Sequence, residues 1–207
     1  MKKIFVTGIS TNIGKTVVSA ILAEALQADY WKPVQAGSFS DTDSVKVQKL
    51  ISNTKSKIHP EAYCLMQPIS PHAAAKMEGI RIELDKINVP QTDNTLIIEG
   101  VGGLMVPLNE KELVIDMIKK LDAEVVLVVA NYLGSINHTL LSLEALQKRN
   151  IKLKSIIFNG APLYLSEEVL ASHGMKDVIL RVFEEDKVDK DMILKYAAKV
   201  NKDLLLK

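Results

Sequence analysis

The sequence predicts an α/β fold, a doubly wound and mostly parallel β-sheet flanked by helices, and three observations support it. Strand patterns and helix patterns alternate along the chain, as expected of βαβ units. Several strand candidates are continuous apolar runs, which is typical of strands covered on both faces. The chain has 207 residues and is 47% hydrophobic and 25% charged. Since it carries no internal repeat or linker, we expect a single domain spanning residues 1–207.

Seven segments have the pattern of strands: 4–6, 30–34, 62–65, 95–99, 124–130, 154–159 and 178–182. The run at 95–99 is a continuous apolar stretch that ends in an acid, and 124–130 is a second such run, which indicates central strands. The segment at 30–34 is expected to end in a loop that contains Gly37. The short segment at 62–65 is expected to be an edge strand.

Five segments have the pattern of helices: 17–23, 43–51, 70–77, 136–148 and 189–200. Asp41, Thr42 and Asp43 are candidate caps of the second helix. Ser70 and Pro71 are typical of a cap and a first helical position. Leucines at helical spacing support the helix at 136–148. Residues 52–60 are polar, which favours a surface connection.

The stretch between the first strand and the first helix reads Gly-Ile-Ser-Thr-Asn-Ile-Gly-Lys-Thr, from Gly8 to Thr16. Its position and its glycines are typical of a phosphate-binding loop, in which backbone amides and a helix N-terminus hold an anion. Five residues separate Gly8 from Gly14, one more than the strict pattern allows. A glycine-capped turn with a chance Gly-Lys-Thr is the alternative, but the flanking strand and helix favour a nucleotide site. Lys15 is then expected at the outer phosphates and Thr16 at Mg²⁺.

Further polar residues fall at the carboxyl ends of predicted strands, where ligands collect in open parallel sheets: Lys32, Glu99 and Asn159. Glu99 precedes a glycine-rich turn, and a carboxylate beside phosphates needs a bridging cation, so it is a candidate Mg²⁺ ligand. A solvated strand-end acid is the alternative. Asp43 is a candidate helix cap and equally a candidate metal ligand. For Lys32, spacing alone does not distinguish a surface lysine from a functional one.

Composition excludes several classes of protein. A net charge of +1 offers no general attraction for nucleic acid or an anionic membrane. No apolar run approaches the roughly 20 residues that span a bilayer, and the first strand begins too early to leave room for a signal sequence. Cys64, expected in the core, is the single cysteine, so no intrachain disulfide can form. We therefore expect a cytoplasmic protein without nucleic-acid or membrane partners.

Five motifs in order resemble the dethiobiotin synthetase family. They are the elongated Gly-x-x-Thr-x-x-Gly-Lys-Thr loop, Lys-Pro-Val-Gln-Ala-Gly at 32–37, an Asp that begins the next helix, Glu-Gly-Val-Gly-Gly at 99–103 and Gly-Ser-Ile-Asn-His at 134–138. The resemblance covers nearly the whole chain. It implies a P-loop NTPase fold and a reaction in which 7,8-diaminononanoate, CO₂ and ATP give dethiobiotin, ADP and phosphate. That reaction proceeds through a carbamate and a carbamic–phosphoric anhydride.

The resemblance also implies roles for individual residues. Lys32 and Lys15 match catalytic positions, and Thr16, Asp43 and Glu99 match Mg²⁺ ligands. ATP and its metal are expected at Asn12, Ile13, Gly14, Lys15, Thr16, Val17, Asp43, Glu99, Gly100, Val101, Gly102 and Asn159. The diamine or its carbamate is expected at Thr11, Lys32, Ala36, Gly134, Ser135 and Asn137. The segment at 134–138 resembles the part that receives the substrate's carboxylate across a homodimer interface, although from the residues alone a polar helix start is the simpler interpretation.

Some positions depart from the family's pattern. Ala36 stands in place of a hydroxyl residue, so only its backbone is available to the substrate. The segment at 181–184, Arg-Val-Phe-Glu, lacks the proline that the family uses near the base, and we expect looser selection among nucleoside triphosphates. The competing class is a regulatory or carrier ATPase of the partitioning type, which usually has a lysine early in the loop. This chain has Ile9-Ser10-Thr11 there. A module that has lost catalysis is disfavoured because the lysines and metal acids are present.

Overall fold

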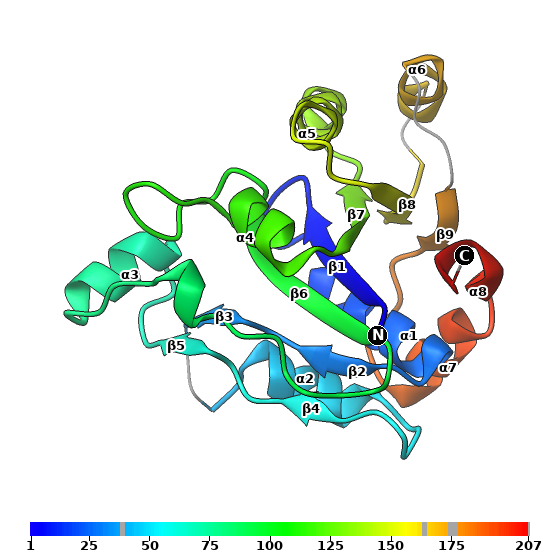
Figure 1. Cartoon of the computed structure of the whole chain (residues 1–207). Coiled ribbons are helices and arrows are strands. Elements are labelled where there is room, and N and C mark those ends of the chain that lie inside the picture. Colours follow the sequence, from blue (N-terminus) through cyan, green and yellow to red (C-terminus); the bar gives the residue numbers. More distant parts are fainter. Residues whose placement is uncertain (38–39, 163–164, 174–177, 207) are drawn as a thin grey trace.

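The computed structural model describes residues 1–37, 40–162, 165–173 and 178–206, and within them the expected α/β fold is confirmed (Figure 1). The strands are β1 (Lys3–Gly8), β2 (Asp29–Trp31), β3 (Val34–Ala36), β4 (Ile58–His59), β5 (Tyr63–Leu65), β6 (Leu96–Gly103), β7 (Glu124–Ala130), β8 (Leu153–Asn159) and β9 (Val178–Val182). Seven of them form a parallel sheet in the order β4-β2-β6-β1-β7-β8-β9. A small second sheet pairs β3 with β5, also in parallel.

Helices cover both faces of the main sheet. The helices of the described residues are α1 (Lys15–Leu26), α2 (Asp43–Leu50), α3 (Pro71–Met77), the 3-10 helix η1 (Leu84–Lys86), α4 (Val114–Leu121), α5 (Ser135–Lys148), α6 (Ser166–Ser172), α7 (Lys190–Ala197) and α8 (Lys202–Leu206). The crossover through α1 runs from β1 toward β2, whereas those through α4 and α5 run the other way along the sheet. Because such crossovers are right-handed, opposite directions place the helices on opposite faces. Accordingly α1 contacts α2 and α7, and α4 lies in front of β6 in Figure 1.

The prediction of one strand at 30–34 is wrong, because the chain forms two separate strands there. Pro33 has no N–H group to donate to a sheet ladder, so β2 ends at Trp31 and β3 starts at Val34. The carbonyl of Pro33 accepts hydrogen bonds from the N–H groups of Ala62 and Tyr63, both at 3.0 Å, and thereby joins the small sheet. The break sends the chain from the main sheet into a separate pair of strands beside the phosphate-binding loop.

Other expectations need smaller corrections. The segment at 52–60 is not only a connection, because Ile58–His59 forms the edge strand β4 beside β2. The predicted edge strand at 62–65 belongs to the small sheet. Helices α4, α6 and α8 were not predicted. For α4 the signal was present in the sequence, since buried apolar residues recur at helical spacing along it.

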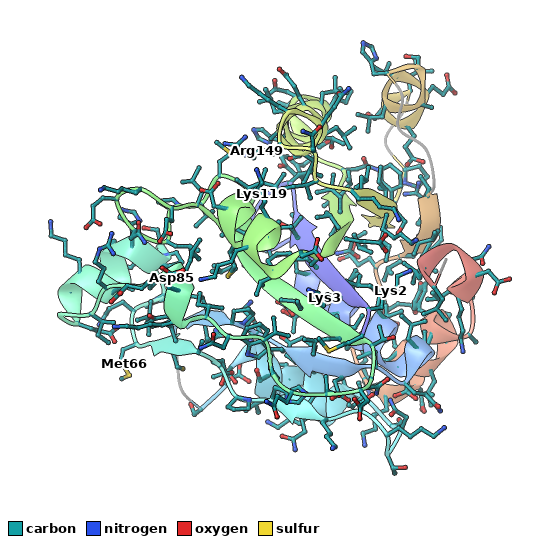
Figure 2. All side chains as sticks on the ribbon, viewed as in Figure 1. Lys2, Lys3, Met66, Asp85, Lys119 and Arg149 are labelled. Carbon is teal, nitrogen blue, oxygen red and sulfur yellow. The ribbon has the colours of Figure 1, made fainter. Side chains whose placement is uncertain are left out.

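The core is built around β1, β6 and β7, whose apolar residues are buried on both faces, as the continuous runs predict. The start of β1 is charged instead. Lys2 and Lys3 lie there (Figure 2), and Lys2 pairs with Glu124 at 3.3 Å. Lys152 and Lys154 pair with the same carboxylate. This lysine cluster lies at the opposite end of the strands from the phosphate-binding loop. None of the helices in the described ranges is long and apolar enough to cross a membrane.

Candidate active site

The phosphate-binding loop connects the end of β1 at Gly8 to the start of α1 at Lys15. Asn12 (φ 55°) and Gly14 (φ 87°) are left-handed, a conformation that glycine and asparagine tolerate best. At Gly14 a Cβ atom would also lie 2.2 Å from Nδ2 of Asn159, so this position requires glycine. No side chain caps α1, and its first turn contains no acid. Its free N–H groups therefore suit an anion.

Lys15 folds back over this loop. Its Nζ atom donates a hydrogen bond of 2.9 Å to the carbonyl of Ser10. Burial, followed by the positive charge of Lys32, lowers its pKa to about 8. A buried cation that is held by a single backbone carbonyl is well placed to bind phosphate oxygens.

Lys32 is the centre of the polar cluster next to the loop. Its Nζ atom lies 2.5 Å from Oδ2 of Asp43 and 3.0 Å from Oε1 of Glu99, and it donates to the carbonyl of Gly100 at 3.3 Å. The side chain is 4% exposed. Burial alone would lower its pKa, but the charges of Glu99 and Asp43 outweigh burial and raise it. Lys32 is therefore a fixed cation at the end of β2 and not a surface lysine.

Asp43 is the first residue of α2, and Thr42 is the cap, accepting a hydrogen bond of 3.2 Å from the N–H of Val45. The carboxylate of Asp43 is thus not used for capping and points to Lys32 instead. Burial raises its pKa, but the charge of Lys32 and hydrogen bonds from Lys32 and Thr16 leave the pKa below its ordinary value. Its backbone N–H donates to Oε1 of Gln35 at 3.1 Å, which ties the start of α2 to β3.

Thr16, Asp43 and Glu99 make a donor set that fits Mg²⁺. The Thr16 hydroxyl donates to Oε1 of Glu99 at 2.9 Å, and Lys32 bridges the two carboxylates. Protein sites for Mg²⁺ beside phosphates usually supply only one or two carboxylates, and substrate and water supply the rest. In keeping with this, the described residues contain no group of three or more His, Cys, Asp or Glu that would hold a metal unaided.

A cavity of about 610 Å³ brings most of the predicted residues together. It is lined by Thr11, Asn12, Ile13, Gly14, Lys15, Thr16, Val17, Lys32, Ala36, Asp43, Glu99, Val101 and Gly102, among others. A second, largely apolar cavity of about 320 Å³ shares Thr11 and Val106 with it. The two spaces therefore adjoin at Thr11.

The remaining predicted residues lie outside both cavities. Asn159 donates through Nδ2 to the carbonyl of Ile13 at 2.9 Å, so its amide is bound to the phosphate-binding loop. Gly134 (φ 99°) precedes α5, Ser135 is buried at its first position and Asn137 is exposed. None of these three residues lines either cavity, although His138 lines the smaller one.

Tyr30 was not predicted as a site residue, but it is fully buried and its hydroxyl donates to Oε2 of Glu99 at 2.9 Å. Burial and the negative charge of Glu99 raise its pKa well above the ordinary value, so it acts as a neutral donor. The alternation of side chains along β2 was the available signal, because it places Tyr30 on the same face as Lys32. Cys64 is half-buried and not in the core as expected, and burial raises its pKa.

Two kinds of known protein are similar to this chain: relatives in sequence, and solved structures in fold. A family model described as an AAA domain matches residues 2–192. The ATP-dependent dethiobiotin synthetase BioD of Cytophaga hutchinsonii is 53% identical over 201 residues, which is 97% of each chain. The protein of the same name from Christiangramia forsetii is 51% identical over 203 residues, 98% of each chain.

Solved structures resemble the chain at much lower identity. A ParA family ATPase from Chlorobium tepidum TLS has a TM-score of 0.59 at 14% identity, over 96% of this chain and 92% of the other. A chain of the MinC:MinD cell division protein complex of Aquifex aeolicus has a TM-score of 0.61 at 11% identity, over 100% and 97%. This likeness confirms the P-loop NTPase fold and shows no more than the fold. The motifs and the two relatives that match over nearly their full length agree, and the chain belongs to the dethiobiotin synthetase family.

Proposed function

We propose that this protein catalyses the ATP- and Mg²⁺-dependent carboxylation and ring closure of 7,8-diaminononanoate to dethiobiotin, a step of biotin synthesis. Membership of the family supports this reaction. The observation that carries it is the convergence of Lys15, Thr16, Lys32, Asp43 and Glu99 on one cavity at the carboxyl ends of the strands. A phosphate site, a metal site and a buried cation then face the same space.

ATP binds with its phosphates along residues 12–17, where the uncapped start of α1 offers N–H groups. Lys15 exchanges the Ser10 carbonyl for phosphate oxygens. The base lies toward the ends of β8 and β9, where Asn159 pairs in register with Val182. Phe183 follows β9 and is 49% exposed, and Arg181 is held by the Gly160 carbonyl and by Glu167. An exposed aromatic ring selects weakly among bases, because every base has a stacking face.

Thr16, Asp43 and Glu99 would hold Mg²⁺ beside the nucleotide phosphates. When bound, the ion supplies positive charge to the phosphate oxygens during transfer. The carboxylate oxygens available to it include those that now accept from Lys32. Lys32, which bridges the two carboxylates, would then lie beside both the ion and the substrate.

The diamine lies where the two cavities adjoin, near Thr11, Lys32 and the backbone of Ala36. The apolar walls of the smaller cavity suit its alkyl chain. Its carboxylate is received by Gly134, Ser135 and Asn137 of a second copy of the chain, at a helix start with no side-chain cap and no acid in its first turn. Exposed Leu133 and Leu141 next to this segment favour burial in a homodimer.

The chemistry has three steps. One amine attacks CO₂ and loses a proton, giving a carbamate. A carbamate oxygen then attacks the γ-phosphorus of ATP and displaces ADP, giving the mixed anhydride. The second amine attacks the carbonyl carbon, phosphate leaves, a proton is lost, and the cyclic urea closes. Lys32 stabilises the carbamate and the equatorial oxygens in transfer, and Lys15 does so from the loop.

We further propose that the protein works in the cytoplasm on small molecules alone, with no nucleic-acid or membrane partner. The net charge of +1 and the single cysteine support this placement.

The test is phosphate release from ATP, Mg²⁺ and bicarbonate, with and without 7,8-diaminononanoate, with mass spectrometry of the products. Release that requires the diamine and accompanies dethiobiotin is the expected result. Equal release in both reactions would instead favour a regulatory ATPase. Release without dethiobiotin would contradict ring closure.

A further inference from the structure

Tyr30 reaches the candidate metal site from the strand next to Glu99. In the pairing of β2 with β6, Tyr30 is in register with Ile97. Because side chains alternate along a strand, Glu99 lies on the same face as Ile97, one step further toward the carboxyl end. The Tyr30 hydroxyl therefore points along the face that carries Glu99 and meets Oε2 at 2.9 Å.

The two carboxylate oxygens of Glu99 have different partners. Oε1 accepts from the Thr16 hydroxyl at 2.9 Å and from Lys32 at 3.0 Å, both of which line the larger cavity. Oε2 accepts from Tyr30, which is fully buried and does not line that cavity. The tyrosine thus holds the oxygen on the core side and leaves the other for the nucleotide side.

We propose that Tyr30 is a positioning residue for Mg²⁺, which fixes the rotation of the Glu99 carboxylate so that Oε1 faces the ion. This inference rests on the proposed role of Glu99 as a metal ligand. Tyr30 touches neither metal nor substrate and acts only through Glu99. Without its hydroxyl, Oε2 would be buried with no donor from the described part of the chain, and the carboxylate would turn to share Thr16 and Lys32 between its oxygens. Partners that orient metal ligands typically change metal affinity or activity by about 10- to 100-fold.

A purely structural role makes a different prediction. Tyr30 is among the largest fully buried side chains of the core, and a packing role needs only its ring. Tyr30→Phe keeps the ring and removes the hydroxyl. Tyr63→Phe is a matched control, since the Tyr63 hydroxyl accepts a hydrogen bond from the N–H of Glu83, away from the cavity.

The experiment measures ATP binding to the full chain by calorimetry over a series of Mg²⁺ concentrations, after circular dichroism has verified that each variant folds. For Tyr30→Phe we expect the half-saturating Mg²⁺ concentration to rise about 10-fold or more, with ATP binding at saturating Mg²⁺ near that of the wild type. Tyr63→Phe should leave the Mg²⁺ titration unchanged. A Tyr30→Phe variant that melts earlier but has the wild-type Mg²⁺ titration would overturn the inference and leave the proposed function intact. A wild-type titration with no Mg²⁺ dependence would instead overturn the metal site itself.

A double-mutant cycle tests whether Tyr30 acts through Glu99. In a Glu99→Gln background, the added Tyr30→Phe change should cause little further loss of Mg²⁺ affinity, because the ligand that it orients is already impaired. An equal further loss in both backgrounds would show that Tyr30 acts by another route and would refute the proposal.

Discussion

Replacement of Lys32 by methionine is the most informative single perturbation of this site. The change keeps the apolar stem and removes the charge that lies 2.5 Å from Asp43 and 3.0 Å from Glu99. Asp43 would keep a distant partner, Lys46, at 3.9 Å. Glu99, with its side chain 1% exposed, would keep, among the residues that the structure describes, only the hydroxyl groups of Thr16 and Tyr30 as partners. Most of the loss of folding stability should therefore come from the uncompensated charge of Glu99.

The size of the effect follows from this burial. Removing one member of a buried ion pair typically costs about 3–5 kcal/mol, because a charge is left without compensation. For a chain of this length each kcal/mol lowers the melting temperature by roughly 2–4 °C. We therefore expect Lys32→Met without ligand to melt roughly 10 °C below the wild type. Mg²⁺ with ATP should narrow the gap, since the ion restores positive charge beside both carboxylates.

The assay is thermal unfolding followed by circular dichroism, with and without Mg²⁺ and ATP. Lys154→Met is a matched control, because the Lys154 side chain is also little exposed, at 7%, but its partner Glu124 keeps Lys2 and Lys152. That control should lose about 1 kcal/mol or less. In turnover, Lys32→Met should be slower by about 10²–10³-fold. Equal melting of Lys32→Met, the control and the wild type would refute the view that Lys32 neutralises the buried carboxylates.

Four further outcomes are expected. Glu99→Gln should weaken only the Mg²⁺-dependent part of ATP affinity, and an unchanged Mg²⁺ titration would remove Glu99 from the metal site. Gly14→Ala should lower ATP affinity by about 10-fold or more in calorimetry, because its Cβ would lie 2.2 Å from Nδ2 of Asn159 and its φ is +87°; wild-type affinity would contradict the loop geometry. The pKa of Lys15 is lowered from 10.5 to about 8 in the fold, so the unfolded chain binds its proton more tightly between these values. The free energy of unfolding of the ligand-free wild type should therefore rise relative to that of Lys15→Met between pH 8 and 10.5. If denaturant unfolding gave the two proteins the same pH dependence of stability, the lowered pKa of Lys15 would be refuted. Finally, GTP and CTP should support turnover within about 10-fold of ATP, given the segment at 181–184 and sequence-tolerant stacking on its phenylalanine; background rates with both would show strict base selection.

Much of the fold was predictable because its signals are local. Strands buried on both faces are mostly continuous apolar runs, and this property indicated β6 and β7. The phosphate-binding loop was recognised because strand, glycines, Lys15, Thr16 and helix are contiguous in sequence. The break at Pro33 was foreseeable from the missing N–H group, but its consequence was not. That β3 would leave the main sheet and pair with β5 depends on a partner nearly thirty residues away.

By itself, then, the sequence determined the fold class, the phosphate-binding loop and the family, since short-range periodicity and contiguous motifs encode them. It left the roles of Lys32 and Asp43 open, because a lysine before a proline and an acid at a helix start have common structural explanations. The tertiary structure shows where these side chains lie, because β2 beside β6 brings Lys32 to Glu99 across 67 residues of sequence. The pairing of β2 with β6 also places Tyr30 beside Glu99, and no sequence motif indicated this tyrosine. Strand order depends on how the sheet and the helix layers pack together, and local sequence patterns do not encode it. That order brings together the charged side chains that must neutralise one another in a buried site.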